Sequence, residues 1–186
     1  LILTIQVRAI RWKYILNKKI KINDLYVAQL IGYMGNNIFP LRFGEFLKSF
    51  YVEKKINISK YQAFGSVILE RILDLLGIGF LFILLIQSNL FNKVDDLYQN
   101  IIIGLIFFSV CAFFVSFYIN KKIKNKFFKK LPKLLSDIII GFSNIKTNNI
   151  FTIFILTVLI WINYILVVYL VQLSFDIGLN LTQSIL

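Results

Sequence analysis

Two long stretches without any charged residue limit what this chain can fold into. Residues 101–119 carry no charge in 19 positions, and residues 150–173 carry none in 24. A hydrocarbon core of about 30 Å needs roughly 20 apolar residues in a helix that rises about 1.5 Å per residue. Each stretch is therefore predicted to be a transmembrane helix. Because 58% of the 186 residues are apolar and only 16% are charged, too few polar residues remain to cover a water-soluble core.

Two shorter apolar runs predict further crossings. Residues 1–10 are predicted to be the end of a span, and residues 59–88 reach the required length only if the helix includes Glu70, Arg71 and Asp74. The chain begins without methionine and ends just after an apolar run. We therefore expect a fragment of a longer polytopic protein, with residues 1–186 forming a single membrane domain.

Basic residues are concentrated between these spans. Of the 21 lysines and arginines, 19 lie in three segments, residues 8–24, 42–60 and 121–146. Lysine and arginine in short loops resist translocation, so these segments, including the basic segment 120–149, are predicted to be cytoplasmic in a multi-pass protein of the cell (inner) membrane. Orientation and attraction to anionic lipid explain the net charge of +12, so no nucleic-acid partner is expected.

Residues 22–51 do not fit a simple span. They lie between cytoplasmic segments, so they cross the membrane an even number of times or not at all. The pattern predicts a helix near 25–34, a break at 35–40 and a second helix after Pro40. The predicted fold is therefore all-α, a polytopic helical membrane bundle with a re-entrant, broken hairpin on the cytoplasmic side. The alternative is a pair of amphipathic helices lying flat on the cytoplasmic surface.

The helix of residues 59–88 has a recognisable start and carries its charges near that end. Ser59 and Gln62 form the Ser-x-x-Gln pattern of a capping box, with Ser59 as N-cap. Glu70 and Asp74 are four residues apart and share one face. Each charge costs roughly 2.5 to 3.5 kcal/mol in a membrane helix. Ion pairing or a water-filled surrounding is therefore expected.

Arg42 and Glu45 of the hairpin offer complementary charges for Glu70 and Arg71. Two such pairs would neutralise most of the cluster, so it could be only a structural lock between hairpin and helix. The chain uses 17 lysines and four arginines, and two of those arginines occupy this cluster. Arginine binds carboxylate or phosphate through two parallel hydrogen bonds, which lysine cannot copy. The presence of arginine instead of lysine in this cluster therefore favours a functional site.

The segments GNNIFPLRFGE at 35–45 and LERILD at 69–74 resemble the paired signature of the lysylphosphatidylglycerol synthase transmembrane region, a flippase-like membrane protein family. The segment at 8–12 is similar to the basic and aromatic end of an early helix in that family. The resemblance implies a polytopic inner-membrane protein that moves lipids between leaflets, such as aminoacylated phospholipid or polyprenyl-linked sugars. It implies these motif residues: Asn37, Pro40, Arg42, Gly44, Glu45, Glu70, Arg71 and Asp74.

The leading hypothesis is a lipid flippase or translocase whose partners are membrane lipids, either anionic phospholipid or lipid-linked sugar. No phosphate-binding loop for ATP occurs, so transport is expected to be downhill or coupled to protons. The predicted headgroup-binding residues are Asn36, Asn37, Arg42, Glu45, Glu70, Arg71 and Asp74. The residues predicted to shape the motif are Gly35, Pro40 and Gly44.

Two other functions remain open. The chain could be a non-transporting anchor that presents substrate to a separate or fused lipid-modifying enzyme. It could also be a membrane-embedded transferase with a metal at Asp95 and Asp96. The chain has no histidine and one cysteine, so imidazole-based catalysis and zinc clusters are excluded. No catalytic residue, cofactor or metal is expected in this fragment, although a transferase domain could lie outside it.

Three local features have structural interpretations. Trp12, between Arg11 and Lys13, is predicted to be an interfacial anchor. Residues 121–133 carry seven lysines among apolar residues and form either an amphipathic helix on anionic lipid or a topology-setting loop. Gly77 and Gly79 are expected to permit close helix packing.

Overall fold

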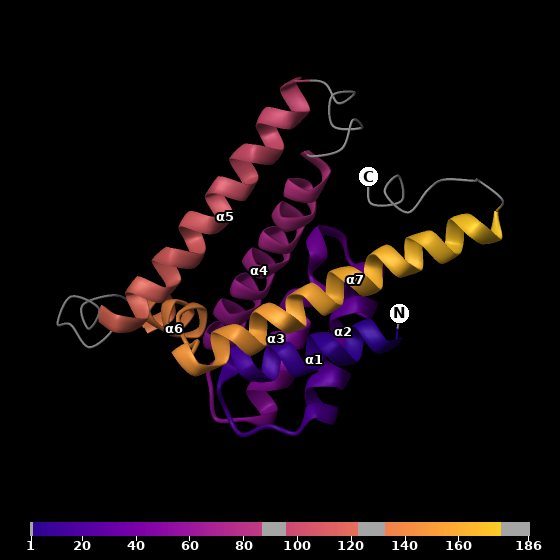
Figure 1. The fold of residues 1–186 in the computed structure, drawn as a ribbon. Coiled ribbons are helices and arrows are strands. Elements are labelled where there is room, and N and C mark those ends of the chain that lie inside the picture. The colour runs from indigo at the N-terminus through magenta and orange to yellow at the C-terminus, as the bar shows by residue number, and fades with distance from the viewer. Residues whose placement is uncertain (1, 87–95, 123–132, 176–186) are drawn as a thin grey trace.

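The computed structural model describes residues 2–86, 96–122 and 133–175, and within these ranges the chain is helical apart from short connections (Figure 1). The prediction of an all-α fold is confirmed for these residues. The α-helices are α1 (Ile2–Leu16), α2 (Ile22–Ile38), α3 (Gly44–Lys55), α4 (Lys60–Ile86), α5 (Asp96–Lys122), α6 (Lys133–Phe142) and α7 (Ile150–Ser174). Short 3-10 turns, η1 (Pro40–Arg42) and η4 (Thr147–Asn149), precede α3 and α7.

The two uncharged stretches are helices. Helix α7 covers the predicted range 150–173, and α5 extends the range 101–119 at both ends. Among the described residues, only the helical segment Thr147–Ser174 is both long enough and apolar enough to cross a membrane. Helix α4 has 27 residues, but Glu70, Arg71 and Asp74 interrupt its apolar sequence.

Helix α4 begins where its sequence predicts. The Ser59 Oγ atom accepts a hydrogen bond of 3.1 Å from the backbone N–H of Gln62, as expected for an N-cap. The backbone N–H of Lys60 donates to Glu53 near the end of α3, so two of the free donors of this helix end have local partners. The predicted end of the helix, at residues 87–88, lies outside the described residues.

Helix α1 continues beyond the predicted boundary at residue 10. It runs to Leu16, so Arg8 and Arg11 are part of a helix and are buried. The prediction that Trp12 is an interfacial anchor is wrong, because its side chain is completely buried and its indole Nε1 donates to Ser66 Oγ at 2.9 Å. The helix carries the basic and aromatic residues into the bundle because they lie on its packed face.

The hairpin breaks later than the glycine and asparagine residues predicted. Helix α2 continues through 35–38 and ends before Phe39, whose backbone is extended at φ −102° and ψ 143°. Proline disfavours the helical conformation of the residue that precedes it, so Pro40 rather than Gly35 sets the end. Leu41 and Arg42 follow with positive φ values of 59° and 54°, which reverse the chain into α3.

Small residues let the two arms of this hairpin pack closely. A Cβ atom added to Gly44 would overlap the carbonyl of Gly32 and the backbone nitrogen of Asn36. Gly35 likewise faces the backbone of Gly44 at a distance that leaves no room for a side chain. The helix–break–helix unit is therefore a tightly packed pair. Its re-entrant position in a bilayer remains a prediction.

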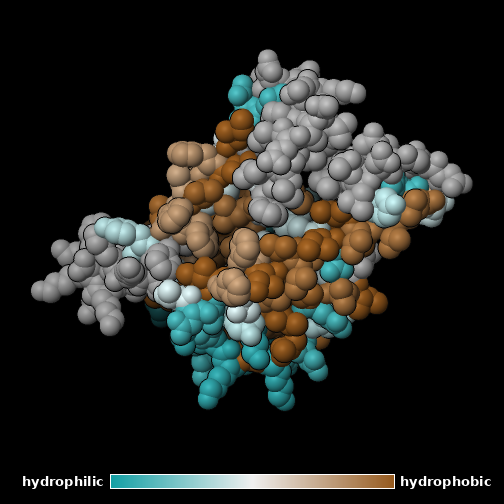
Figure 2. All heavy atoms as spheres, viewed as in Figure 1, coloured by the Kyte–Doolittle hydropathy of each residue, from teal (hydrophilic) through white to brown (hydrophobic). Residues whose placement is uncertain are grey.

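Helix α1 packs against α7, α2 and α4 (Figure 1). Helix α6 packs on α4, where Gly65 and Gly141 each face the other helix's backbone. Hydrophobic residues cover much of the surface, and hydrophilic residues gather at one end (Figure 2). That end carries the short linkers at 17–21 and 56–59 (Figure 1).

Candidate functional site

Glu70 of α4 is fully buried at a point where three other helices meet. Lys48 of α3 donates to its Oε2 atom at 2.7 Å, and Gln29 of α2 donates to Oε1 at 3.2 Å. Arg8 and Arg11 of α1 lie 3.6 Å and 3.5 Å from Oε1. One carboxylate therefore ties α1, α2 and α3 to α4.

Asp74 lies one turn further along α4 and shares the same arginines. Arg11 Nη2 lies 2.7 Å from Oδ1, and Arg8 Nη2 lies 3.1 Å from Oδ2. Arg71 Nη1 also contacts Oδ2, at 3.1 Å along the helix. Arg8 and Arg11 therefore each bridge Glu70 and Asp74, which the i, i+4 spacing places on one face.

The predicted pairing across the hairpin is half right. Arg71 Nε binds Glu45 Oε1 at 2.5 Å, which confirms that contact. The expected pair between Arg42 and Glu70 is wrong, because Arg42 is exposed and Glu70 binds Lys48 instead. Glu45 and Lys48 are three residues apart on α3 and face α4 together, whereas Arg42 precedes the helix.

Two more contacts connect these charges to the surrounding helices. Arg11 Nη1 donates to Thr157 Oγ1 of α7 at 3.2 Å, which adds a fifth helix. The Lys48 ammonium lies 4.7 Å from the centroid of the Trp12 ring, within the range of a cation–π interaction. The site is thus assembled from α1, α2, α3, α4 and α7.

We name the seven charged residues the ion-pair network: Arg8, Arg11, Glu45, Lys48, Glu70, Arg71 and Asp74. They are four cations and three carboxylates, so the network has one positive charge in excess. Each member has at least one partner of opposite charge. Buried ion pairs pay a large desolvation cost, which only close geometry and extra hydrogen bonds offset. The network links α1, α3 and α4 through these contacts.

The other predicted site residues lie outside this network. Asn37, Pro40 and Arg42 are exposed around the tip of the hairpin, and Arg42 forms no ion pair with the described residues. Asn36 Oδ1 is buried without a hydrogen-bond partner there. It lies against Gly44 at the junction of α2 and α3. The structure therefore separates the predicted set into a buried cluster and an exposed tip.

Sequence reasoning missed Arg8, Arg11, Gln29 and Lys48. Three of the four arginines in this lysine-rich chain belong to the network, so the preference for arginine was a usable signal. Lys48 gave no such signal, because it lies in a segment whose other lysines are explained by membrane orientation. Only the packing of α3 on α4 distinguishes it.

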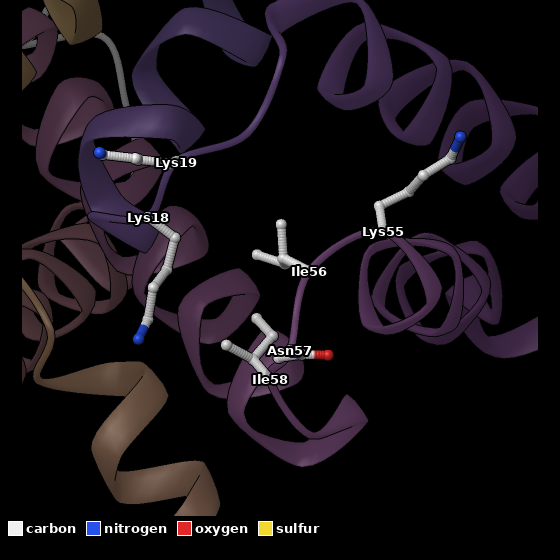
Figure 3. Close-up of a pocket in the computed structure, with 6 residues that line it drawn as sticks. All are labelled: Lys18, Lys19, Lys55, Ile56, Asn57 and Ile58. Carbon is white, nitrogen blue, oxygen red and sulfur yellow. The ribbon is translucent and has the colours of Figure 1, made fainter.

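A second basic feature is an open cavity of about 380 Å³ at the hydrophilic end. Lysines 18, 19 and 55 line it with Ile56, Asn57 and Ile58, and in Figure 3 the lysine side chains extend in different directions away from Ile56. Lys55 Nζ lies 3.2 Å from Asp24 Oδ1, and this hydrogen bond raises the pKa of Lys55. The three lysine ammonium groups around this cavity therefore do not converge on one point.

The predicted Asp95–Asp96 metal site and the alternatives for residues 121–133 cannot be placed, since Asp95 and residues 123–132 lie outside the described residues.

These observations describe a helical bundle in which seven charged residues are gathered between helices. The whole chain, residues 1–186, matches the family described as the lysylphosphatidylglycerol synthase TM region, and the chain belongs to this family. The resemblance noted from the segments at 35–45 and 69–74 is thereby confirmed.

Two curated relatives come from Methanocaldococcus jannaschii. The UPF0104 membrane protein MJ1595 is 31% identical over 132 residues, which cover 67% of this chain and 39% of the relative. The UPF0104 membrane protein MJ1078 is 28% identical over 151 residues, which cover 78% of this chain and 63% of the relative. The chain thus spans less than two thirds of either relative. No solved structure matched it.

Proposed function

We propose that this chain is part of a lipid translocase in the inner membrane, which moves the headgroup of a phospholipid or a lipid-linked sugar between leaflets. In this proposal the helices form a multi-pass bundle and the basic linkers face the cytoplasm. Residues 1–10, 59–88, 101–119 and 150–173 belong to spans, and residues 22–51 form the re-entrant hairpin.

The excess positive charge of the ion-pair network is the observation that carries the proposal. A buried cluster with four cations and three carboxylates is electrostatically complementary to an anion. It includes three arginines, whose planar groups bind phosphate through paired hydrogen bonds. A headgroup crosses a membrane only if protein groups replace its water, and this network offers such groups at the junction of α1, α3 and α4.

Arg71 and Glu45 form the accessible edge of the network. The side chain of Arg71 is 34% exposed, whereas that of Arg11 is completely buried. A phosphate can therefore reach Arg71 and replace Glu45 as its partner without unpacking the core. Arg42, at the tip of the hairpin, is a second cation that the headgroup would contact.

The apolar surface of the hairpin tip supports the re-entrant position. Leu41 is 97% exposed, and its neighbours Ile38, Phe39 and Phe43 are also exposed. Hydrophobic side chains gathered at a turn are costly in water and favourable in hydrocarbon. A tip inserted into the bilayer buries them, whereas a hairpin lying flat on the surface would bury only one side.

The decisive experiment is leaflet exchange of a fluorescent phospholipid in reconstituted vesicles. Arg71→Lys keeps the charge but loses the bidentate geometry, so we expect exchange to slow by about tenfold or more, the loss of one charge-assisted hydrogen bond. Lys55→Gln, which removes a surface ion pair outside the network, is the matched control and should leave the rate unchanged. Equal rates for the parent and Arg71→Lys would contradict the proposal.

The second candidate function is a non-transporting anchor for a separate or fused lipid-modifying enzyme. Its support is that every charge of the network is already paired, as a structural lock requires. An anchor should give vesicles no exchange above the protein-free rate, while its removal should lower the activity of the enzyme. The activity of any such enzyme is not assigned to this chain.

A further inference from the structure

The open cavity at the hydrophilic end lies between two linkers that are far apart in the sequence. Lys18 and Lys19 belong to the linker 17–21 after α1, while residues 56–58 follow Lys55 at the end of α3 (Figure 3). Both linkers lie at the end of the bundle where hydrophilic residues gather (Figure 1, Figure 2). We name the hollow that these residues line the linker cavity.

The lysines of the linker cavity carry more positive charge than the surrounding protein neutralises. Lys55 has a carboxylate partner, Asp24, at 3.2 Å. Lys18 and Lys19 are exposed and form no ion pair with the part of the chain that the structure describes. Two positive charges at the cavity are therefore available to a partner.

Membrane orientation does not account for this arrangement. The preference of basic loops for the cytoplasm depends on how many lysines and arginines a short loop contains, and not on where their side chains lie. Anionic lipid attracts basic residues at the level of the headgroups, whereas the linker cavity is a hollow formed by linkers at the end of the bundle (Figure 1). Because a flat layer of headgroups does not fill a hollow, a partner from the aqueous side fits it better.

The shape and composition of the cavity specify the kind of partner. The three lysine side chains extend in different directions (Figure 3), so one phosphate group cannot contact them all, whereas carboxylates spaced along an extended peptide can. Ile56 is half-buried and offers an apolar contact among the lysines. The exposed amide of Asn57 can both donate to and accept from a peptide backbone.

We infer that the linker cavity binds an acidic, extended segment of a cytoplasmic protein. Carboxylates of that segment pair with Lys18 and Lys19, and an apolar side chain between them contacts Ile56. The inference rests on the cytoplasmic orientation of the linkers, which is part of the proposed function, but it requires no transport. Each exposed ion pair contributes little by itself, so we expect association of modest affinity that complementary charges accelerate and salt weakens.

The test uses a fluorescent peptide of four Asp-Asp-Leu repeats, whose binding to the purified chain in uncharged maltoside detergent is followed by fluorescence anisotropy. We expect saturable binding by the parent that weakens as salt is added. The double variant Lys18→Gln, Lys19→Gln should bind about tenfold more weakly. Because both lysines are exposed and lack an ion pair in the described ranges, this variant should keep the Tm of the parent. A peptide of Asn-Asn-Leu repeats should not bind.

Two other exposed lysines provide a control of equal charge. Lys54 does not line the cavity, and Lys146 lies in a segment beside the end of α1, where Asn149 donates to the Tyr14 carbonyl at 3.4 Å. The double variant Lys54→Gln, Lys146→Gln lowers the net charge by the same amount and should weaken binding by less than about twofold, because salt screens charges outside the site. Equal losses in both double variants would overturn the inference, since the peptide would then respond only to net charge.

A membrane contact of the cavity is the alternative that the same proteins test. Dihexanoyl phosphatidylglycerol is titrated into the parent and into the variant Lys18→Gln, Lys19→Gln. If the Asp-Asp-Leu peptide binds no better than the Asn-Asn-Leu peptide and the variant loses affinity for the lipid, the cavity contacts the membrane surface and the inference is overturned.

Leaflet exchange by the parent separates this inference from the proposed function. Exchange without binding of the acidic peptide would refute the inference and leave the translocase proposal standing. Lysine-dependent peptide binding without exchange would support the inference and refute the translocase proposal.

Discussion

Glu70 is the residue on which the stability of the bundle should depend most. Its carboxylate accepts contacts from three helices and is fully buried. Glu70→Gln would leave the network with two positive charges in excess, and breaking a buried pair from one side costs about 3 to 5 kcal/mol. We expect a loss of this size in the free energy of unfolding, measured by denaturant titration in mild detergent.

Lys48→Met is the contrasting variant at the other end of the same ion pair. It removes a cation, so the network becomes neutral while Glu70 keeps both arginines of α1. Methionine also fills much of the volume of the lysine stem. A loss clearly smaller than that of Glu70→Gln is expected, and a larger one would show that excess charge does not govern stability here.

At Leu41, glycine should be more stabilising than alanine, which is the reverse of the order at an ordinary helical position. Its φ of 59° lies in the left-handed region, where a Cβ atom costs roughly 1 to 2 kcal/mol and glycine avoids this cost. Leu41→Gly is therefore expected to be more stable than Leu41→Ala by about 1 kcal/mol in thermal unfolding. If the alanine variant is the more stable one, the backbone at the tip does not adopt this conformation.

At the scale of elements, glycine has opposite roles in two places. An added methyl group on Gly44 would overlap the backbone of α2, whereas nothing lies within 4 Å of one on Gly104 in α5. Gly44→Ala is expected to lower the free energy of unfolding by about 1 to 3 kcal/mol through overpacking. Gly104→Ala should raise it by about 0.5 to 1 kcal/mol through helix propensity. Parallel thermal unfolding in detergent tests both, and equal effects would contradict the close packing of α2 on α3.

Sequence patterns located most helices and misplaced some of their ends. The capping pattern at Ser59 placed the start of α4 because a cap is a local contact. The break between α2 and α3 was misplaced because glycine and asparagine lower helix propensity only modestly, and packing against Gly44 compensates. Trp12 was assigned to the interface because its neighbours are basic, and the sequence does not show that Arg11 points into the bundle.

At the scale of the whole molecule, the orientation of the basic linkers can be tested by labelling. In a Cys111→Ser background, Lys146→Cys precedes α7 and Ser174→Cys lies at its end. A membrane-impermeant maleimide added to intact spheroplasts is expected to label Ser174→Cys and to reach Lys146→Cys only after lysis. The reversed pattern would overturn the predicted orientation, and with it the cytoplasmic entry of the hairpin.

The class of protein and its family could be determined from the sequence alone. Long uncharged runs allow few folds other than membrane helices, and the paired motifs at 35–45 and 69–74 are local strings that need no structure to be recognised. Helix spacing also placed Glu70 and Asp74 on one face, since that relation depends only on the pitch of a helix.

Only the tertiary structure decided which charges meet. Ion pairs between helices depend on how each helix is rotated about its axis and how far it slides along its neighbour, and neither quantity is written in a local pattern. Arg8 and Arg11 approach α4 across more than 60 residues of sequence, while Arg42, expected as a partner, is left at an exposed tip. The excess charge of the network is a property of that packing.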